Sequence, residues 1–264
     1  MKAMKILMLG VMALMLTPTF SISADNNKTE TDATVSSEKA LREFRLNKIL
    51  LIDVRSQEAY DKLHIPGSLN IPLFAVKTKP FLKTRPIILV NEGFSITPLE
   101  TECRSLQAKG FHATVLAGGL IAWNAQKAPL EGDPRELATL RMVTADTFHQ
   151  EKNRPGLVLV DAAKPEPAKP TQPINAIPLT TFVSTKQKRS PQPVLIFTGD
   201  GAGYDNIQYQ LEKAGAGPAF FLSGGIQGYN SFLNNLALLH RPQEERTQSI
   251  SACPSCAKKA KDDV

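Results

Sequence analysis

Cysteine offers the most obvious chemistry in this sequence, and the chain has only three cysteines: Cys103, Cys253 and Cys256. The last two form a Cys253-Pro-Ser-Cys256 pair, a spacing found in disulfides, redox dithiols and halves of metal sites. Ala257 follows this pair in place of the histidine that c-type haem attachment needs. A closed zinc site would need two more ligands, from His240 or a second chain. We expect a local disulfide, without cofactor or bound metal; redox or sulfur-carrying exchange and metal binding are the alternatives.

Cys103 has a different setting. It falls within a predicted helix over residues 98–109, with Leu99 four residues before it and Leu106 three residues after it. This spacing places the thiol on the apolar stripe that faces the core. We therefore predict a buried thiol that packs as a small hydrophobic side chain.

Composition limits the classes of protein to which this chain can belong. The chain has 264 residues, of which 42% are hydrophobic and 21% charged. Disordered, collagenous and coiled-coil proteins have different compositions and are excluded. Three cysteines are too few for a disulfide scaffold, so the fold depends on packing, either in one large domain or in two small ones.

The N-terminus is predicted to be a secretory signal peptide over residues 1–24. Lys2 and Lys5 precede the mostly apolar segment 6–20, and small residues end the segment near Ala24. An uncleaved membrane anchor is the alternative, disfavoured because the apolar run is short and contains Pro18. We expect a periplasmic or secreted protein without a stable membrane anchor. Removal of the two lysines leaves 29 basic and 25 acidic residues, which gives no indication of nucleic-acid binding.

An internal repeat decides the domain count. Four segments recur in the same order at offsets of 106 to 108 residues, which predicts two copies of one domain. The pairs are Leu50–Asp53 with Leu157–Asp161, Asn70–Leu73 with Ala176–Leu179, Pro86–Asn91 with Pro193–Thr198, and Gly118-Gly119 with Gly224-Gly225. We define the first copy as residues 35–128 and the second as residues 142–240. Residues 129–141 are then a linker and residues 241–264 a polar tail.

Each copy alternates short apolar runs with amphipathic segments, the pattern of a parallel α/β sheet flanked by helices. Thr97 is the predicted N-cap of the helix over 98–109, and Gly110 its terminator. The matching helix of the second copy is predicted from near Asp205 to Gly215. The predicted strands cover residues 50–54, 87–90, 113–116, 157–160, 194–197 and 219–222.

The motifs of the first copy resemble those of a rhodanese domain. They are Leu51-Ile-Asp-Val-Arg55, Tyr60, His64-Ile-Pro-Gly-Ser68, Asn70-Ile-Pro72 and Leu116-Ala-Gly-Gly-Leu-Ile-Ala-Trp123, in family order. The second copy is similar but eroded: Asp161 and Ile177-Pro178 remain, His64 has no counterpart, and Tyr229 stands in the place of Trp123.

The resemblance implies a tandem sulfurtransferase that moves sulfane sulfur from thiosulfate or a mercaptopyruvate-like donor to an acceptor. In that family, a cysteine after the fourth strand is surrounded by a loop whose N–H groups stabilise the thiolate. The corresponding loops here, residues 91–97 and 198–204, contain no cysteine. Asn91 and Thr198 occupy the place of the nucleophile, and neither side chain carries sulfane sulfur as a thiolate does. Glu92 and Asp200 add negative charge that repels an anionic donor.

We therefore predict a protein without ordinary sulfurtransferase activity that acts as a binding or accessory module in sulfur or redox metabolism. The degenerate loop positions are Asn91, Glu92, Gly93, Thr198, Gly199 and Asp200. A small anion could still bind the N–H groups at Gly93, Phe94 and Ser95 or at Gly201, Ala202 and Gly203, and a cation or neutral polar ligand is an alternative.

Two other functions remain open. The thiols of Cys253 and Cys256 could act in a thiosulfate-type sulfurtransferase or persulfide carrier, or the repeat could display a surface to an exported protein partner. His64, Asp53 and Asp161 are predicted to be structural, with His64 capping a turn and the two aspartates bonding neighbouring loops.

Overall fold

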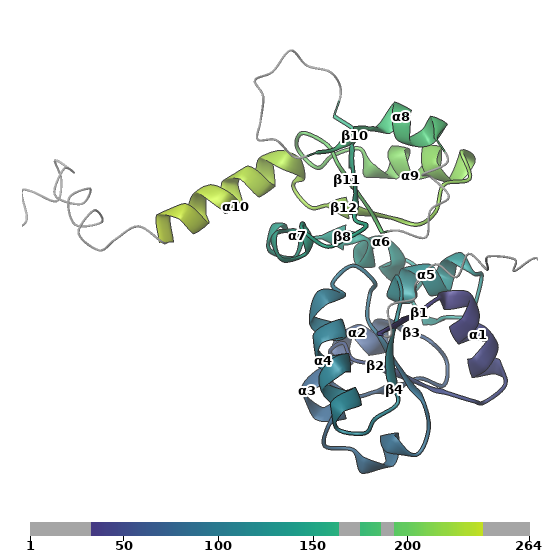
Figure 1. Cartoon of the computed structure of the whole chain (residues 1–264). Helices are drawn as coiled ribbons and strands as arrows, with labels where there is room; N and C mark the ends of the chain where they lie inside the picture. The colour runs from purple at the N-terminus through teal and green to yellow at the C-terminus, as the bar shows by residue number, and fades with distance from the viewer. Residues whose placement is uncertain (1–32, 164–174, 186–192, 240–264) are drawn as a thin grey trace, which may run out of the picture. The chain divides into compact units, whose positions relative to one another are not determined.

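The computed structural model describes residues 33–163, 175–185 and 193–239 (Figure 1). The predicted signal peptide and the pair Cys253 and Cys256 lie outside these ranges. The described residues form two five-stranded sheets, one in each copy, and every neighbouring pair of strands within them is parallel. The predicted α/β architecture of two parallel sheets is confirmed.

The two sheets have the same strand order. In spatial order, the first sheet contains β1 (Thr34–Val35), β6 (Ala113–Leu116), β5 (Ile87–Val90), β2 (Leu50–Asp53) and β4 (Leu69–Asn70). The second contains β8 (Met142–Val143), β12 (Ala219–Leu222), β11 (Val194–Phe197), β9 (Val158–Asp161) and β10 (Ile177–Pro178). The second copy therefore keeps the topology of the first, although it has lost several sequence motifs.

Helices connect the strands of each copy. The first copy has α1 (Ser37–Arg45), α2 (Gln57–Lys62), α3 (Leu73–Val76), the 3-10 helix η1 (Pro80–Lys83), α4 (Thr97–Ala108) and α5 (Gly119–Ala125). The second copy has α7 (Ala145–Glu151), α8 (Leu179–Ser184), α9 (Tyr204–Lys213) and α10 (Gly225–Leu239). Side-chain oxygens of Ser36, Ser56 and Thr144 accept backbone N–H bonds at the starts of α1, α2 and α7, so local sequence sets where these helices begin.

Both faces of the first sheet are covered, as Figure 1 shows with α1 and α5 on one side and α3 and α4 on the other. Successive residues of a strand point to opposite faces. Ile87 and Leu89 of β5 accordingly pack in a core under α4, whereas Ile88 and Val90 pack in the core under α1 and α5. This explains why the run 87–90 is apolar at every position.

The predicted core strands agree with the observed ones to within one residue at each end. The edge strands β1, β4, β8 and β10 were not predicted, because two residues are too few to show a period. The prediction of Thr97 as an N-cap was wrong: α4 begins at Thr97 itself and Ile96 is its N-cap. The Thr97 hydroxyl instead donates to Glu151 Oε2 over 2.9 Å.

The predicted linker, residues 129–141, contains regular structure. It includes β7 (Glu131–Gly132), which pairs antiparallel with β3 (Leu63–His64), and α6 (Glu136–Leu140). The limits 35–128 and 142–240 remain predictions, since the structure continues from one copy into the other through these elements. No helix in the described ranges is long and apolar enough to cross a membrane.

Candidate functional site

The candidate site in the first copy is the loop that joins β5 to α4. Two N–H groups at the start of α5 hold this loop: Leu120 donates to Asn91 O over 2.9 Å and Ile121 to Glu92 O over 3.3 Å. Gly93 has a φ of +121°, and a Cβ atom there would lie 2.1 Å from Gly118 O. The loop therefore approaches the Gly118-Gly119 backbone so closely that only glycine fits at position 93.

The loop that joins β11 to α9 repeats this arrangement in the second copy. Ile226 donates to Thr198 O over 2.9 Å, and Gln227 donates to Gly199 O over 3.0 Å. Gly201 has a φ of +82°, and a Cβ atom there would lie 2.7 Å from Gly224 N. The Gly-Gly pairs found by the internal repeat thus have the same role in both copies: they let the first loop dock on the start of α5 and the second on the start of α10.

The side chain in the place of the nucleophile ties each loop closed. Asn91 is 4% exposed, and its Nδ2 donates to Ser95 O over 2.7 Å. Thr198 is 8% exposed, and its hydroxyl donates to Ala202 O over 3.3 Å. Each side chain bridges to the carbonyl four residues further along. Both positions are therefore buried and engaged in the structure of the loop.

Side-chain oxygens of the chain itself already accept some of the N–H groups of the first loop. Ser95 N donates to Glu92 Oε1 over 3.0 Å, and Thr97 N donates to Glu151 Oε1 over 2.9 Å. An external anion at these N–H groups has to displace a carboxylate. The predicted anion site at Gly93, Phe94 and Ser95 remains a prediction under that condition.

The N–H groups of the second loop are engaged in a similar way. Gly201 N donates to Thr198 Oγ1 over 2.9 Å, and Ala202 N donates to Asp200 Oδ1 over 3.0 Å. Gly203, the third predicted binding residue, has a φ of +80° and precedes α9 as its N-cap. Here too the anion site remains a prediction, because a ligand would compete with oxygens of Thr198 and Asp200.

Residues of the second copy cover the first loop. Phe94 is buried, and its ring centroid lies 5.3 Å from that of Phe220 in β12. Arg154 Nη1 donates to Phe94 O over 2.6 Å. Sequence reasoning missed Glu151 and Arg154, because nothing in the charged end of α7 distinguishes them from residues of a solvated helix face.

A small hollow of about 320 Å³ lies beside the first loop. Its lining residues are Glu92, Phe94, Ser95, Leu140, Met142, Val143, Thr144 and Thr147. Glu92 is the one charged residue in this lining, so the hollow disfavours anions and accommodates a neutral or cationic group.

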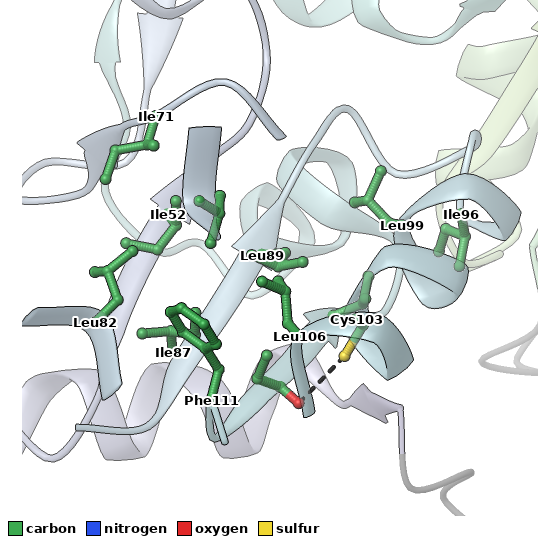
Figure 2. Packing of buried hydrophobic residues seen from close by; sticks show 13 residues of the cluster. Ile52, Ile71, Leu82, Ile87, Leu89, Ile96, Leu99, Cys103, Leu106 and Phe111 are labelled. Atoms are coloured by element: carbon green, nitrogen blue, oxygen red, sulfur yellow. Dashed lines mark hydrogen bonds between the residues drawn. The ribbon is translucent and has the colours of Figure 1, made fainter. Parts of the chain in front are cut away.

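Cys103 is a buried core residue, as predicted. Figure 2 shows it on α4 among Leu99, Leu106 and Leu89. Sγ donates to Ala113 O over 3.2 Å. Burial raises the pKa of the thiol to about 11, so it stays protonated at neutral pH and is a poor nucleophile.

The other motif residues make structural contacts. Arg55 forms a buried ion pair with Asp53 over 2.6 Å and also donates to Leu63 O over 2.6 Å, which ties the end of β2 to β3. His64 Nδ1 lies 2.9 Å from Tyr60 O, and since a carbonyl only accepts, Nδ1 carries the proton. His64 thereby caps the C-terminal end of α2. Asp161 Oδ1 accepts a hydrogen bond from Ala163 N over 2.8 Å.

The family model of the rhodanese-like domain matches residues 36–126. This match covers nearly all of the first copy and about a third of the chain. The second copy has the same strand order and the same loop docking as the first, so the described residues form two copies of one fold in tandem. The match agrees with the family order of the motifs in the first copy, and the match does not extend to the second copy.

Solved structures similar to the chain include a rhodanese-like domain from Anabaena, which is 25% identical. The alignment covers 39% of this chain and 80% of the Anabaena chain, with a TM-score of 0.34. A protein from Bacillus halodurans is 24% identical and covers 38% of this chain and 77% of its own, with a TM-score of 0.35. A thiosulfate sulfurtransferase from Pseudomonas aeruginosa is 18% identical and covers 75% of this chain and 42% of its own, with a TM-score of 0.34. No curated protein matches the chain in sequence.

Proposed function

We propose that this chain is an exported tandem rhodanese-like protein that does not transfer sulfur at its own loops and that acts as a binding or accessory module in sulfur or redox metabolism. One observation carries the proposal. The position that a sulfur-carrying thiolate would need is filled in both copies by a buried side chain, Asn91 or Thr198, that bonds the carbonyl four residues on. An amide or an unactivated hydroxyl does not accept and release sulfane sulfur.

The charges around the first loop support the same conclusion. Glu92 and Glu151 place carboxylates on the N–H groups of Ser95 and Thr97. Arg154 offsets the charge of Glu151, so a thiosulfate dianion approaching this loop meets the Glu92 carboxylate, at a Coulomb cost of about 1 kcal/mol in water per pair of unit charges about 4 Å apart and more in a partly buried site. The ligand of the module is then a neutral or cationic group at the loop, or an exported protein partner.

Assay of the full secreted chain with thiosulfate and cyanide tests the proposal. We expect thiocyanate formation no faster than with a thiol-free control that carries Cys103→Ala, Cys253→Ser and Cys256→Ser. The control keeps both loops, so activity that remains in it comes from the loops, whereas activity lost in it comes from the thiols. Thiocyanate formation by the thiol-free control well above the rate without protein would refute the proposal.

A second candidate function relocates the sulfur chemistry to the tail. It is favoured by the burial of Cys103, which leaves Cys253 and Cys256 as the thiols outside the described core. In this case the tail accepts a sulfur atom from a persulfide donor, with the donor thiol as leaving group, and one tail cysteine becomes the persulfide.

Mass spectrometry of the tail peptide separates the two candidates. After incubation with a persulfide donor, the second candidate predicts the added mass of one sulfur atom on the wild-type peptide and its loss in Cys253→Ser, Cys256→Ser or both. A tail peptide that stays unmodified argues against a carrier and leaves the binding module as the function.

A further inference from the structure

The last residue of α7, Glu151, is bound at the N-terminus of α4. Its carboxylate is fully buried, at 0% exposure, although it belongs to the second copy and α4 to the first. Oε1 accepts from Thr97 N and Oε2 from Thr97 Oγ1, each over 2.9 Å. Arg154 Nη1 supplies a third hydrogen bond to Oε2, over 3.1 Å. Three donors thus converge on one carboxylate.

The arrangement has the features of an anion site. The first N–H groups of a helix carry a partial positive charge and lack intrahelical acceptors, and α4 is a helix of 12 residues. Arg154 adds a full positive charge, and its side chain is only 10% exposed. Burial lowers the pKa of Arg154, and the nearby Glu151 partly offsets this. Without an anion, Arg154 would lose its charge partner and the helix end its acceptor, which is costly.

The same residues close the loop that precedes α4. Arg154 also donates to Phe94 O, and its guanidinium carbon lies 5.4 Å from the centroid of the Phe94 ring. Phe94 also packs in a core with Val143, Phe148 and Phe220 of the second copy. The loop of the first copy is therefore held by one charged and one apolar contact, both from the second copy.

We propose that the second copy is a built-in ligand of the first: the Glu151 carboxylate is the anion bound at the N-terminus of α4, and it keeps the loop 91–97 closed to small anions. This goes beyond the proposed function, because it gives the degenerate copy a role of its own. It holds whether or not the tail carries sulfur, and its tests measure stability and loop access instead of sulfur transfer.

Chemical rescue of Glu151→Ala in the full chain tests the bound anion. Truncation leaves the three donors without an acceptor, and we expect the melting temperature to fall by roughly 6–12 °C. Sodium formate should raise it again by several degrees relative to sodium chloride at equal ionic strength, because formate fits the vacated position. The wild type should show no such difference between the two salts.

Phe148→Ala is the matched control. Phe148 lies on the same helix and is fully buried, so its truncation destabilises the same interface without vacating an anion position. We expect no formate-specific rise in this variant. The proposal is overturned if Glu151→Ala melts as the wild type does, or if formate stabilises both truncations equally.

Loop access is tested with a variant that keeps the shape of the glutamate. In a background of Cys253→Ser and Cys256→Ser, Asn91→Cys places one reactive thiol in the loop. Adding Glu151→Gln removes a negative charge from the helix end, and we expect iodoacetamide to modify the introduced thiol about tenfold faster at pH 7. Asp146→Asn removes a charge from the exposed side of α7, where Asp146 Oδ2 accepts from Gln150 Nε2 over 2.9 Å, and should change the rate little. Equal rates with and without Glu151→Gln would contradict the proposal, even if Glu151→Ala fails to fold.

Discussion

The loops 91–97 and 198–204 have the same backbone arrangement but different side chains. In each, two N–H groups at the start of a later helix, α5 or α10, donate to the first two carbonyls of the loop, and a glycine with positive φ lies against a Gly-Gly pair. The first position is Asn91 in one loop and Thr198 in the other, and each bonds the carbonyl four residues on. The comparison teaches that this loop needs glycine docking and a side chain that closes it, but does not need a thiol.

The loops differ in where their closing contacts come from. The first is closed from outside, by Glu151, Arg154 and the core around Phe94. The second is closed from within: Tyr204 donates to Leu222 O over 2.6 Å and accepts from Thr198 N over 3.4 Å. Asp200, Ala202 and Gly203 remain exposed there. The first loop has become part of an interface, whereas the second keeps a surface open to solvent.

The largest loss of stability is expected at the glycine docking that the two loops share. Gly93→Ala forces a Cβ against Gly118 O at 2.1 Å, whereas Gly110→Ala, also at positive φ, meets nothing within 4 Å. We expect Gly93→Ala to lower the free energy of unfolding by more than about 4 kcal/mol and Gly110→Ala by about 1 kcal/mol. Denaturant unfolding measures both. Similar losses for the two variants would show that the docking is not tight.

The next largest effect should differ between the two loops, because buried charged side chains close only the first. Arg154→Met leaves the buried Glu151 carboxylate without its cation, which should cost about 3 kcal/mol. In the second loop, Asp200→Asn removes a charge that is exposed and should cost less than about 1 kcal/mol. Urea unfolding of both variants gives the comparison. If Asp200→Asn were the more damaging, the first loop would not be the one closed by charge.

The closing side chains provide a smaller and more symmetrical test. Asn91→Ala removes the bond to Ser95 O and leaves a small void, at a cost of about 2 kcal/mol. Thr198→Val keeps the volume but leaves Gly201 N without its acceptor, at a cost of about 1–2 kcal/mol. Thermal unfolding should show both losses. A neutral effect of either variant would mean that the loop is closed by its glycine docking alone.

The smallest expected effect tests whether the Cys103 thiol is buried in the core. The pKa of Cys103 is raised from 9.0 to about 11, so its stabilising contribution is complete below pH 9 and is lost as the pH rises through 11. At pH 10 the wild type should have lost about 1.4 kcal/mol more stability, relative to pH 7, than Cys103→Ala. Urea unfolding at the two pH values tests this. Parallel losses in both proteins would indicate a thiol that is accessible to solvent.

Much of the fold could be predicted because it depends on local pattern. The run 87–90 is apolar at every position, and a strand that is covered on both faces requires that. The Gly-Gly pairs aligned the two copies, and the structure explains them through the docking of the loops. The two-residue edge strands escaped detection, and the start of α4 was placed one residue late, because Thr97 has the side chain of an N-cap but bonds a residue of another helix.

The sequence by itself determined that no thiol stands in either loop, since the residue type at a position is a local property. Which groups satisfy the N–H groups of the first loop was decided only by the tertiary structure. Thr97 and Glu151 are separated by 54 residues, and their hydrogen bonds exist because packing of the second copy brings the end of α7 to the start of α4. A buried carboxylate and a solvated one have the same letter in a sequence, and only their surroundings in the folded chain distinguish them.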